Sequence, residues 1–246
     1  MDKYGLIGHP LAHSFSQGYF TDKFQSENIN AVYLNFDLAS IDEFPEVIAA
    51  HPTLRGLNVT IPYKQKIIPF LDEIDKEAQA IGAVNVVRVE HRGSRSRLMG
   101  FNTDAIGFYQ SLQPLLQPHH QRALILGTGG ASRAIHYVLT KKLGIECVFV
   151  SRFERPDTVS YDKIDEQALQ DYPLVVNCTP LGMFPKVNDC PPIPYEALST
   201  RNLLFDLVYN PDTTLFMKKG AERGATVKNG LEMLILQAIA SWQHWQ

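Results

Sequence analysis

The chain has 246 residues, a formal net charge of −3, and 45% hydrophobic against 20% charged residues. This composition excludes a disordered chain, and the length suffices for one large domain or two modest ones. The net charge and a pI near 6.2 provide no broad positive field for a nucleic-acid backbone or an anionic membrane. The composition therefore predicts a globular protein whose partner is a small molecule.

Several features bear on the cellular compartment. No apolar run approaches the roughly 20 residues that a membrane span needs, and the best candidate, residues 123–127, has only the length of a strand. The N-terminal sequence MDKYGLIGHP lacks the long apolar core of a secretory signal. Cys147, Cys178 and Cys190 form an odd set without the close-pair spacing of a metal site. Together these features predict a cytoplasmic protein outside the membrane.

In chain order, apolar runs of strand length alternate with amphipathic stretches. The first series has predicted strands at 4–7, 31–36, 56–59 and 84–89, with helices around 19–24 and 67–80. After a helix at 105–116 and the break Gln117-Pro118-His119-His120, a second series of strands follows at 123–126, 147–150, 174–177 and 203–207. The alternation predicts an α/β protein of two domains, with a boundary near residue 104.

The closing segment is predicted to be a helix. It has one apolar stripe at intervals of three and four, formed by Leu231, Leu234, Ile235, Ala238, Ile239 and Trp242. Gln237 lies roughly 130° from the centre of this stripe, so its side chain can leave the core and face a cleft. A solvent-facing glutamine fits the same position.

A glycine-rich turn connects the strand at 123–126 to a helix predicted at 134–143. The turn reads Gly127-Thr128-Gly129-Gly130-Ala131-Ser132. Gly127 can make the sharp turn, and Gly129 lets the backbone approach a pyrophosphate whose charge the helix N-terminus favours. Ser132 replaces the third glycine of the dinucleotide-binding motif, where a small residue keeps the helix close to the strand. Strand, turn and helix in this order predict a Rossmann-like domain. Taken without its flanking strand and helix, the same glycine-rich sequence also fits a turn that only connects two elements.

The end of the next strand bears on cofactor choice. It runs into Ser151-Arg152-Phe153-Glu154-Arg155, where an NAD-specific site usually has an acid on the ribose. Arg152 is the first choice for pairing with the 2′-phosphate of NADP, because its planar guanidinium matches a phosphate, and Arg155 is the second. The segment favours NADP, while the neighbouring Glu154 and an exposed-loop role for Arg152 stay as the alternative.

Three polar clusters fall at strand ends or helix starts, where open α/β sheets position ligand groups. They are Ser14 with Ser16, Asn58-Val59-Thr60-Ile61-Pro62-Tyr63-Lys64, and Asn102-Thr103-Asp104. Each cluster alone also fits a structural role: the serines as helix caps, Lys64 as a surface lysine inside a helix that Pro62 starts, and Asp104 as an acid in a first helical turn. The combination carries more information than any one cluster.

The same order of segments continues along almost the entire chain. The substrate-side clusters are joined by Gly82-Ala83-Val84-Asn85, and the glycine turn is followed by Asn177-Cys178-Thr179-Pro180-Leu181-Gly182-Met183, Asp206-Leu207-Val208-Tyr209-Asn210-Pro211, Gly230, Met233-Leu234 and Gln237-Ala238. In the residues of these segments and in their order along the chain, it resembles the shikimate dehydrogenase family. The resemblance implies reversible, NADPH-dependent reduction of 3-dehydroshikimate to shikimate, a step of chorismate and aromatic amino acid biosynthesis.

The resemblance also implies a catalytic pair, Lys64 and Asp104. Hydride addition to a ketone leaves an alkoxide that must gain a proton, and a lysine ammonium can supply both the charge and the proton. We therefore assign Lys64 as proton donor and stabiliser, with Asp104 orienting it and the substrate hydroxyls. A helix N-terminus beside Lys64 would lower its pKa and the Asp104 carboxylate would raise it, so the division of proton roles stays open.

The remaining ligand contacts are carried over by resemblance. Carboxylate contacts correspond to Ser14, Ser16, Thr60 and Tyr209, and ring-hydroxyl contacts to Asn85, Asp104 and Gln237. Cofactor contacts correspond to Gly127, Thr128, Gly129, Gly130, Ala131, Ser132, Ser151, Arg152, Thr179 and Gly230. The chain departs from the family pattern after Ser16, where Gln17-Gly18-Tyr19-Phe20 stands in place of a proline and a His-Asn pair, and at Ser151-Arg152-Phe153, where Asn-Arg-Thr is common.

Two other functions remain open on the sequence. A quinate and shikimate dehydrogenase that uses NAD would share the Lys64–Asp104 pair, and a non-catalytic dinucleotide-binding regulator would need only the glycine turn. The sequence has neither the nucleophile elbow of a serine hydrolase nor a His-Glu-x-x-His metal helix, so no metal is predicted. We expect residues 1–104 with 230–246 to bind substrate, residues 105–229 to bind NADP, a closable cleft, and a monomer or homodimer.

Overall fold

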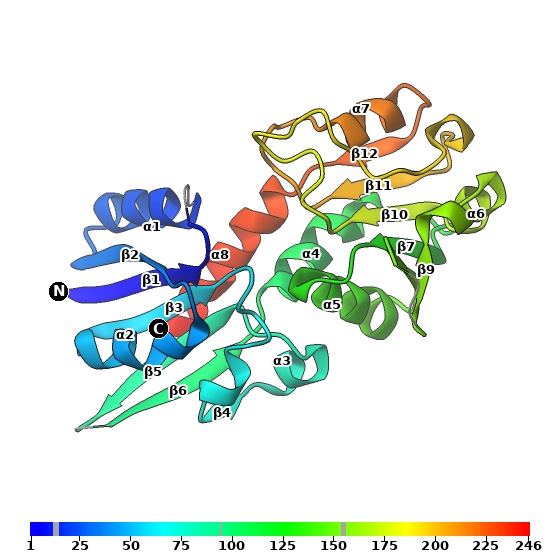
Figure 1. The fold of residues 1–246 in the computed structure, drawn as a ribbon. Coiled ribbons are helices and arrows are strands. Elements are labelled where there is room, and N and C mark those ends of the chain that lie inside the picture. The colour runs from blue at the N-terminus through cyan, green and yellow to red at the C-terminus, as the bar shows by residue number, and fades with distance from the viewer. Residues whose placement is uncertain (12–14, 94, 154–155) are drawn as a thin grey trace. The chain divides into compact units, whose positions relative to one another are not determined.

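The computed structural model describes residues 1–11, 15–93, 95–153 and 156–246, and the chain forms two compact units (Figure 1). Unit 1 comprises Met1–Thr103 with Ala238–Gln246, and unit 2 comprises Asp104–Gln237. The last helix, α8 (Leu231–Trp245), contributes residues to both units. Unit 1 is therefore discontinuous in sequence.

Unit 1 is built on a mixed six-stranded sheet in the order β2-β1-β3-β5-β6-β4. Its strands are β1 (Asp2–Gly8), β2 (Ala31–Asp37), β3 (Leu54–Val59), β4 (Glu73–Ile74), β5 (Val86–Arg92) and β6 (Arg95–Phe101). β1 pairs in parallel with β2 and β3, whereas β5 is antiparallel to both β3 and β6. β3 and β6 consequently end at the same edge of the sheet, and β5 begins there.

Both faces of this sheet are covered by apolar clusters, because successive side chains of a strand point to opposite faces. Leu6 and Val86 belong to the cluster of α1 (Phe15–Ser26) and the end of α8. Ile7 and Val87 belong to the cluster on the other face, which includes residues of α2 (Phe44–Ala50) and α3 (Lys76–Ile81). Short 3-10 helices at Ile41–Glu43 and Ile68–Phe70 complete the unit.

Trp245 fastens the end of α8 to the sheet of unit 1. It is 6% exposed, its indole N–H donates to the carbonyl of Val87 at 3.1 Å, and its ring lies against Gly56, where a Cβ atom would overlap it. We expect Trp245→Ala to lower the free energy of unfolding by about 3–5 kcal/mol, because a buried aromatic side chain is replaced by a cavity. Urea denaturation measures this loss, with Gln243→Ala on the exposed face of α8 as control. An unchanged unfolding midpoint in Trp245→Ala would contradict the packing.

Unit 2 is built on a parallel six-stranded sheet in the order β12-β11-β10-β7-β8-β9. Its strands are β7 (Arg122–Leu126), β8 (Glu146–Ser151), β9 (Thr158–Ser160), β10 (Leu174–Asn177), β11 (Leu203–Asp206) and β12 (Thr226–Lys228). Counted within the unit, this is the Rossmann order 3-2-1-4-5-6, and the direction of winding reverses between β7 and β10. Ligands of such sheets bind beyond the carboxyl ends of the strands at this reversal.

The helices of unit 2 are α4 (Asp104–Leu112), α5 (Gly130–Tyr137), α6 (Glu166–Asp171) and α7 (Leu215–Ala221). A π-helical turn, Val138–Lys142, prolongs α5, and 3-10 turns lie at Gln113–Leu115, Tyr161–Lys163 and Tyr195–Ala197. The core includes Leu124, Val175 and Phe216. The predicted α/β class, with a Rossmann-like domain and an α/β domain completed by the C-terminal helix, is confirmed.

Several local predictions are wrong. The single helix expected at 67–80 is a 3-10 turn, the short strand β4 and α3, because Asp72 accepts the backbone N–H of Leu98 and thereby holds this segment to β6. The sequence analysis does not predict strands β6, β9 and β12, because β6 begins with three polar residues and β9 and β12 have only three residues each. The stripe expected on α8 is also inexact: Ile239 is 42% exposed, while Met233, Ala240 and Trp245 are buried.

Candidate active site

Lys64 lies in a turn beyond the carboxyl end of β3. The backbone N–H of Thr60 donates to the carbonyl of Ile7 at 2.8 Å, and the N–H of Tyr63 donates back to Thr60 at 2.8 Å. The Lys64 carbonyl accepts the N–H of Val84 at 2.7 Å. The expected helix from Pro62 is wrong, since residues 61–67 form turns and the first helical residue is Ile68. Backbone bonds to two other segments thus fix the position of Lys64 without a helix.

The segment around Asn85 is bound to the chain that precedes Asp104. The Asn85 side chain donates to the Thr103 hydroxyl at 3.1 Å and accepts the Thr103 backbone N–H at 2.7 Å. The Asn102 side chain donates to the carbonyl of Ala83 at 2.9 Å. Asp104, 1% exposed, follows directly and begins α4. Asn85 therefore has a structural role, and its contact with a substrate stays a prediction.

A polar network extends from Ser16 to α8. The side chain of Ser16, in the first turn of α1, hydrogen-bonds the Tyr33 hydroxyl, whose pKa burial raises well above its usual value. Tyr33 donates to the Asn58 amide oxygen at 2.7 Å, and the Asn58 amide nitrogen donates to the Ser241 hydroxyl at 2.9 Å. Ser241 also lies 3.2 Å from the Thr103 hydroxyl. Ser14, predicted together with Ser16, lies outside the described residues.

Tyr33 and Ser241 belong to this network, and the sequence analysis singles out neither of them. Tyr33 lies within an apolar strand, and Ser241 falls among the apolar residues of α8. A buried hydroxyl must hydrogen-bond, so a serine next to predicted core positions of a helix is the signal that could have found it.

The glycine turn has the conformation that its sequence predicts. Gly127 adopts φ 106°, which side chains disfavour, and a Cβ there would lie 3.1 Å from the Thr179 methyl group. The Ser132 hydroxyl donates to the carbonyl of Gly129 at 2.7 Å, and Ser132 is 1% exposed. Ser132 therefore fits the packing position of the missing third glycine.

The backbone of this turn is open to a ligand. A Cβ added at Gly129 would meet no described atom within 4 Å, so the backbone can be approached closely, and Thr128 beside it is exposed. Gly130 begins α5, where N–H groups of the first turn favour an anion. These features fit the pyrophosphate of a dinucleotide.

The predicted ribose end lies beside this turn, because β8 pairs with β7 in parallel and Val150 is opposite Leu126. Ser151 ends β8, and Arg152 and Phe153 follow it, both exposed. Phe153 is 70% exposed. Arg155, the second predicted phosphate contact, lies outside the described residues, as does Glu154. The exposed guanidinium at the end of β8 is at the position where a 2′-phosphate would be bound.

Thr179 follows β10 on the other side of the topological reversal. Its backbone N–H and hydroxyl both bond the amide oxygen of Asn177, at 3.0 and 2.6 Å. Its hydroxyl accepts the N–H of Leu181 at 3.3 Å. Thr179 is therefore held against the glycine turn by its own loop.

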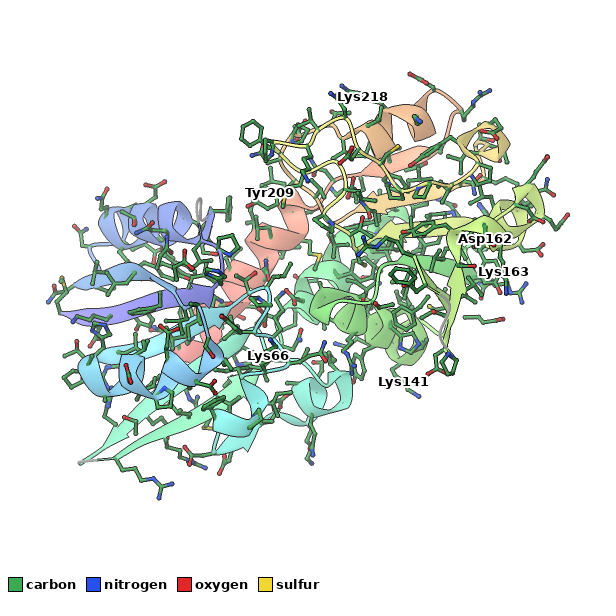
Figure 2. The ribbon with its side chains drawn as sticks, in the orientation of Figure 1. Lys66, Lys141, Asp162, Lys163, Tyr209 and Lys218 are labelled. Atoms are coloured by element: carbon green, nitrogen blue, oxygen red, sulfur yellow. The ribbon has the colours of Figure 1, made fainter. Side chains whose placement is uncertain are left out.

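The predicted residues Tyr209, Gly230 and Gln237 occupy neighbouring parts of unit 2. Figure 2 shows Tyr209 on the loop between β11 and α7, beside the first turn of α8. The N–H of Gly230 donates to the carbonyl of Val208 at 3.1 Å, and a Cβ at Gly230 would overlap the Leu207 carbonyl. Gly230 therefore acts in the structure as a close-packing position, and a cofactor contact there stays a prediction.

Gln237 is next to the helix that Asp104 begins. α4 and α8 are in contact at Gly107. A Cβ atom added there would overlap the backbone carbonyl of Met233 and lie 3.2 Å from the backbone nitrogen of Gln237. Gly107 is one turn after Asp104, so Gln237 lies beside the first turn of α4. This brings together two of the residues predicted to contact ring hydroxyls.

The described residues contain no helix of the length and apolar character that a membrane crossing requires. Within the same residues, no three His, Cys, Asp or Glu side chains gather in a way that could hold a metal ion. Cys147, Cys178 and Cys190 are free thiols.

Comparison with known proteins identifies the family. Residues 6–87 match the model of the shikimate dehydrogenase substrate-binding domain. The chain is 38% identical over 258 residues to the NADP⁺-dependent shikimate dehydrogenase of Carboxydothermus hydrogenoformans, covering 98% of this chain and 90% of the relative. The chain belongs to the shikimate dehydrogenase family.

Solved structures of this family have the same fold. Shikimate 5-dehydrogenase from Thermus thermophilus, in complex with NADP(H) and shikimate, is 30% identical and superimposes with a TM-score of 0.85 over 100% of this chain and 94% of that one. The ligand-free 5-ketofructose reductase of a Gluconobacter species is 26% identical, with a TM-score of 0.79 over 99% and 92% of the two chains. Because a protein named for another ketone has this fold, the substrate must be argued from the site residues.

Proposed function

We propose that this member of the shikimate dehydrogenase family catalyses the reversible, NADPH-dependent reduction of 3-dehydroshikimate to shikimate, in the biosynthesis of chorismate and the aromatic amino acids. The similarity over 98% of the chain to an NADP⁺-dependent shikimate dehydrogenase supports this function. The structural observation that carries it is the shared sheet edge: Lys64 follows the end of β3, Asn85 precedes β5, and Asp104 comes three residues after β6.

Lys64 and Asp104 are the proposed catalytic pair. NADPH, when bound, supplies a hydride to the ketone carbon. The ketone oxygen thereby gains negative charge, and the Lys64 ammonium stabilises that charge and donates the proton that completes the hydroxyl group. The Asp104 carboxylate holds the ammonium and accepts a hydrogen bond from a substrate hydroxyl. In the reverse direction the Lys64 amine takes the proton from the hydroxyl of shikimate.

The proposed substrate contacts divide by chemistry. Hydroxyl donors suit a carboxylate, and amide or carboxylate acceptors suit ring hydroxyls. The first set is Ser14, Ser16, Thr60 and Tyr209, and the second is Asn85, Asp104 and Gln237. The bond between Ser16 and Tyr33 supports a fixed orientation for the first set, and the position of Gln237 beside the first turn of α4 supports the second.

The proposed cofactor contacts are the turn from Gly127 to Ser132 together with Ser151, Arg152, Thr179 and Gly230. The open backbone at Gly129 and the first turn of α5 support a pyrophosphate there. We propose residues 105–229 as the NADP-binding domain and residues 1–104 with 230–246 as the substrate domain. The division into two units supports a discontinuous substrate domain that includes the end of α8 from Ala238, whereas residues 230–237 belong to unit 2.

Arg152→Ala is expected to raise the KM for NADPH roughly 10- to 100-fold, because a charge-assisted bond to the 2′-phosphate is lost. The KM for NADH should stay unchanged, since NADH lacks that phosphate. Steady-state kinetics with each cofactor measure the two constants, and Arg201→Ala, an exposed arginine at the opposite end of the unit 2 strands, is the control. Equal rises for both cofactors would contradict the assignment.

The function is tested by following nicotinamide absorbance with shikimate, quinate and 3-dehydroshikimate and with each cofactor. We expect turnover of shikimate and 3-dehydroshikimate with the phosphorylated cofactor. Phe153 stands where the family commonly has a threonine hydroxyl, which favours a second candidate, a quinate and shikimate dehydrogenase using NAD. Preferential turnover of quinate with NAD would support that candidate, and tight cofactor binding without any turnover would support a non-catalytic regulator.

We propose a cytoplasmic enzyme that is a monomer or homodimer. Three free thiols, with burial raising the pKa of Cys147 to about 12, fit a reducing compartment. Light scattering of the purified chain measures the oligomeric state.

A further inference from the structure

Asp206, at the carboxyl end of β11, is a buried charge that the proposed reaction does not use. It is 0% exposed. Its Oδ1 accepts the Asn177 side-chain amide at 2.9 Å and the Val208 backbone N–H at 3.0 Å, and its Oδ2 accepts the Thr214 hydroxyl at 2.6 Å. An amide, a backbone N–H and a hydroxyl carry no charge, so these partners solvate the carboxylate without neutralising it.

The first partner organises the loop beside the cofactor turn. The Asn177 amide nitrogen bonds Asp206, while its oxygen accepts both the N–H and the hydroxyl of Thr179. Thr179 packs against Gly127, where a Cβ would lie 3.1 Å from its methyl group. Asp206 thus fixes the Asn177 side chain in the orientation that places Thr179 against the glycine turn.

The other two partners organise the loop that carries Tyr209. Val208 and Thr214 hold this loop from both sides of Tyr209. Thr214 also caps α7 by accepting the N–H of Met217 at 3.3 Å. The Val208 carbonyl accepts the N–H of Gly230, which links the same loop to the start of α8.

The two loops also meet directly. The backbone N–H of Phe184 donates to the carbonyl of Asn210 at 3.0 Å. Residues 178–183 therefore cannot shift without the segment that holds Tyr209, as long as the Asp206 bonds are made. One carboxylate connects a predicted cofactor contact to a predicted substrate contact.

Asp206 lowers stability at neutral pH. Burial raises its pKa from 3.8 to about 6, and the three hydrogen bonds oppose this rise only in part. Its titratable neighbours are the Cys178 thiol and the Tyr195 hydroxyl, whose pKa values are raised by burial and by this carboxylate. Because the folded-state pKa is raised, the stability that Asp206 contributes is fully present below pH 3.8 and is lost as the pH rises through about 6. A neutral side chain at this position would make the folded protein more stable at neutral pH.

We propose that Asp206 is a positioning residue, which holds the cofactor-side loop 178–183 and the substrate-side loop 207–211 in one fixed arrangement. Its side chain is fully buried, so we assign its effect to the two loops and not to contact with a ligand. The assignment of cofactor and substrate contacts to these loops rests on the proposed function. The hydrogen bonds that attach the loops to Asp206 do not depend on it.

The test uses Asp206→Asn, which keeps the shape and removes the charge, with the exposed Asp171→Asn of α6 as control. Hydrogen–deuterium exchange of the ligand-free protein is expected to become about 10-fold faster in both loops, with the core strands unchanged. The Kd for NADPH and the KM for 3-dehydroshikimate should each rise roughly 10-fold. The melting temperature at neutral pH should not fall.

Unchanged exchange in both loops would overturn the proposal, and so would faster exchange throughout unit 2 with a lower melting temperature, which is the result of a structural role. If Asp206→Asn does not fold, Thr214→Val replaces it. This variant removes the bond to Oδ2 together with the α7 cap that the same hydroxyl accepts from the Met217 N–H. It is expected to speed exchange in 207–211, and no change there would also overturn the proposal. Absence of turnover in the wild type would contradict the proposed function alone, because exchange and NADPH binding need no turnover.

Discussion

Lys64→Ala is expected to lower kcat/KM for 3-dehydroshikimate by about 10³-fold, with the NADPH affinity and the melting temperature unchanged. The variant removes the ammonium that stabilises and protonates the developing oxyanion. The backbone carbonyl of Lys64, which accepts the N–H of Val84, is retained, so the turn should persist. Steady-state kinetics in the reducing direction measure the loss.

Lys66→Ala is the matched control, since Lys66 is an exposed lysine two residues further along the same turn (Figure 2). Lys64→Arg separates the two roles of the ammonium. An arginine keeps a positive charge but does not release a proton near neutral pH. Recovery of activity in Lys64→Arg would assign the role to charge alone, and wild-type activity in Lys64→Ala would remove Lys64 from the mechanism.

Asp104→Asn is expected to lower kcat by about 10²-fold. The asparagine preserves the shape of a side chain that is 1% exposed, but it lacks the charge that we propose acts on the Lys64 ammonium. Steady-state kinetics with 3-dehydroshikimate measure kcat and KM separately.

Asp171→Asn, the control used for Asp206, serves here too, because Asp171 is exposed at the end of α6. A change in KM alone, with kcat unaltered, would show that Asp104 binds substrate without acting on Lys64. That outcome would contradict the proposed pair and retain the proposed hydroxyl contact.

Local chemistry made parts of this structure predictable. The strand predicted at 174–177 is β10 (Leu174–Asn177), because a short run of buried apolar residues between turns has few alternatives. The glycine turn was equally readable, since the positive φ of Gly127 is costly for other residues. Ser132 shows the limit: its small size was recognised as sufficient, but its bond to the Gly129 carbonyl was not foreseen.

Other parts depend on partners far away in sequence. β6 (Arg95–Phe101) has polar residues that are held in a strand by pairing with β5, and no pattern of its own indicates this. The network through Tyr33 and Ser241 likewise requires the register of β1, β2 and β3 and the docking of α8. Sequence spacing contains no information on such register.

The sequence by itself determined the α/β class, the two series of strands and the glycine turn, and by resemblance it supplied the proposed catalytic pair. These depend on residue type, local order and periodicity. The tertiary structure decided that Lys64 lies in a turn, that Asn85 holds the chain before Asp104, and that Asp206 joins two loops. In each unit those features arise where strands distant in sequence end at the same edge of their own sheet, because hydrogen bonds between such ends exist only once that sheet has formed.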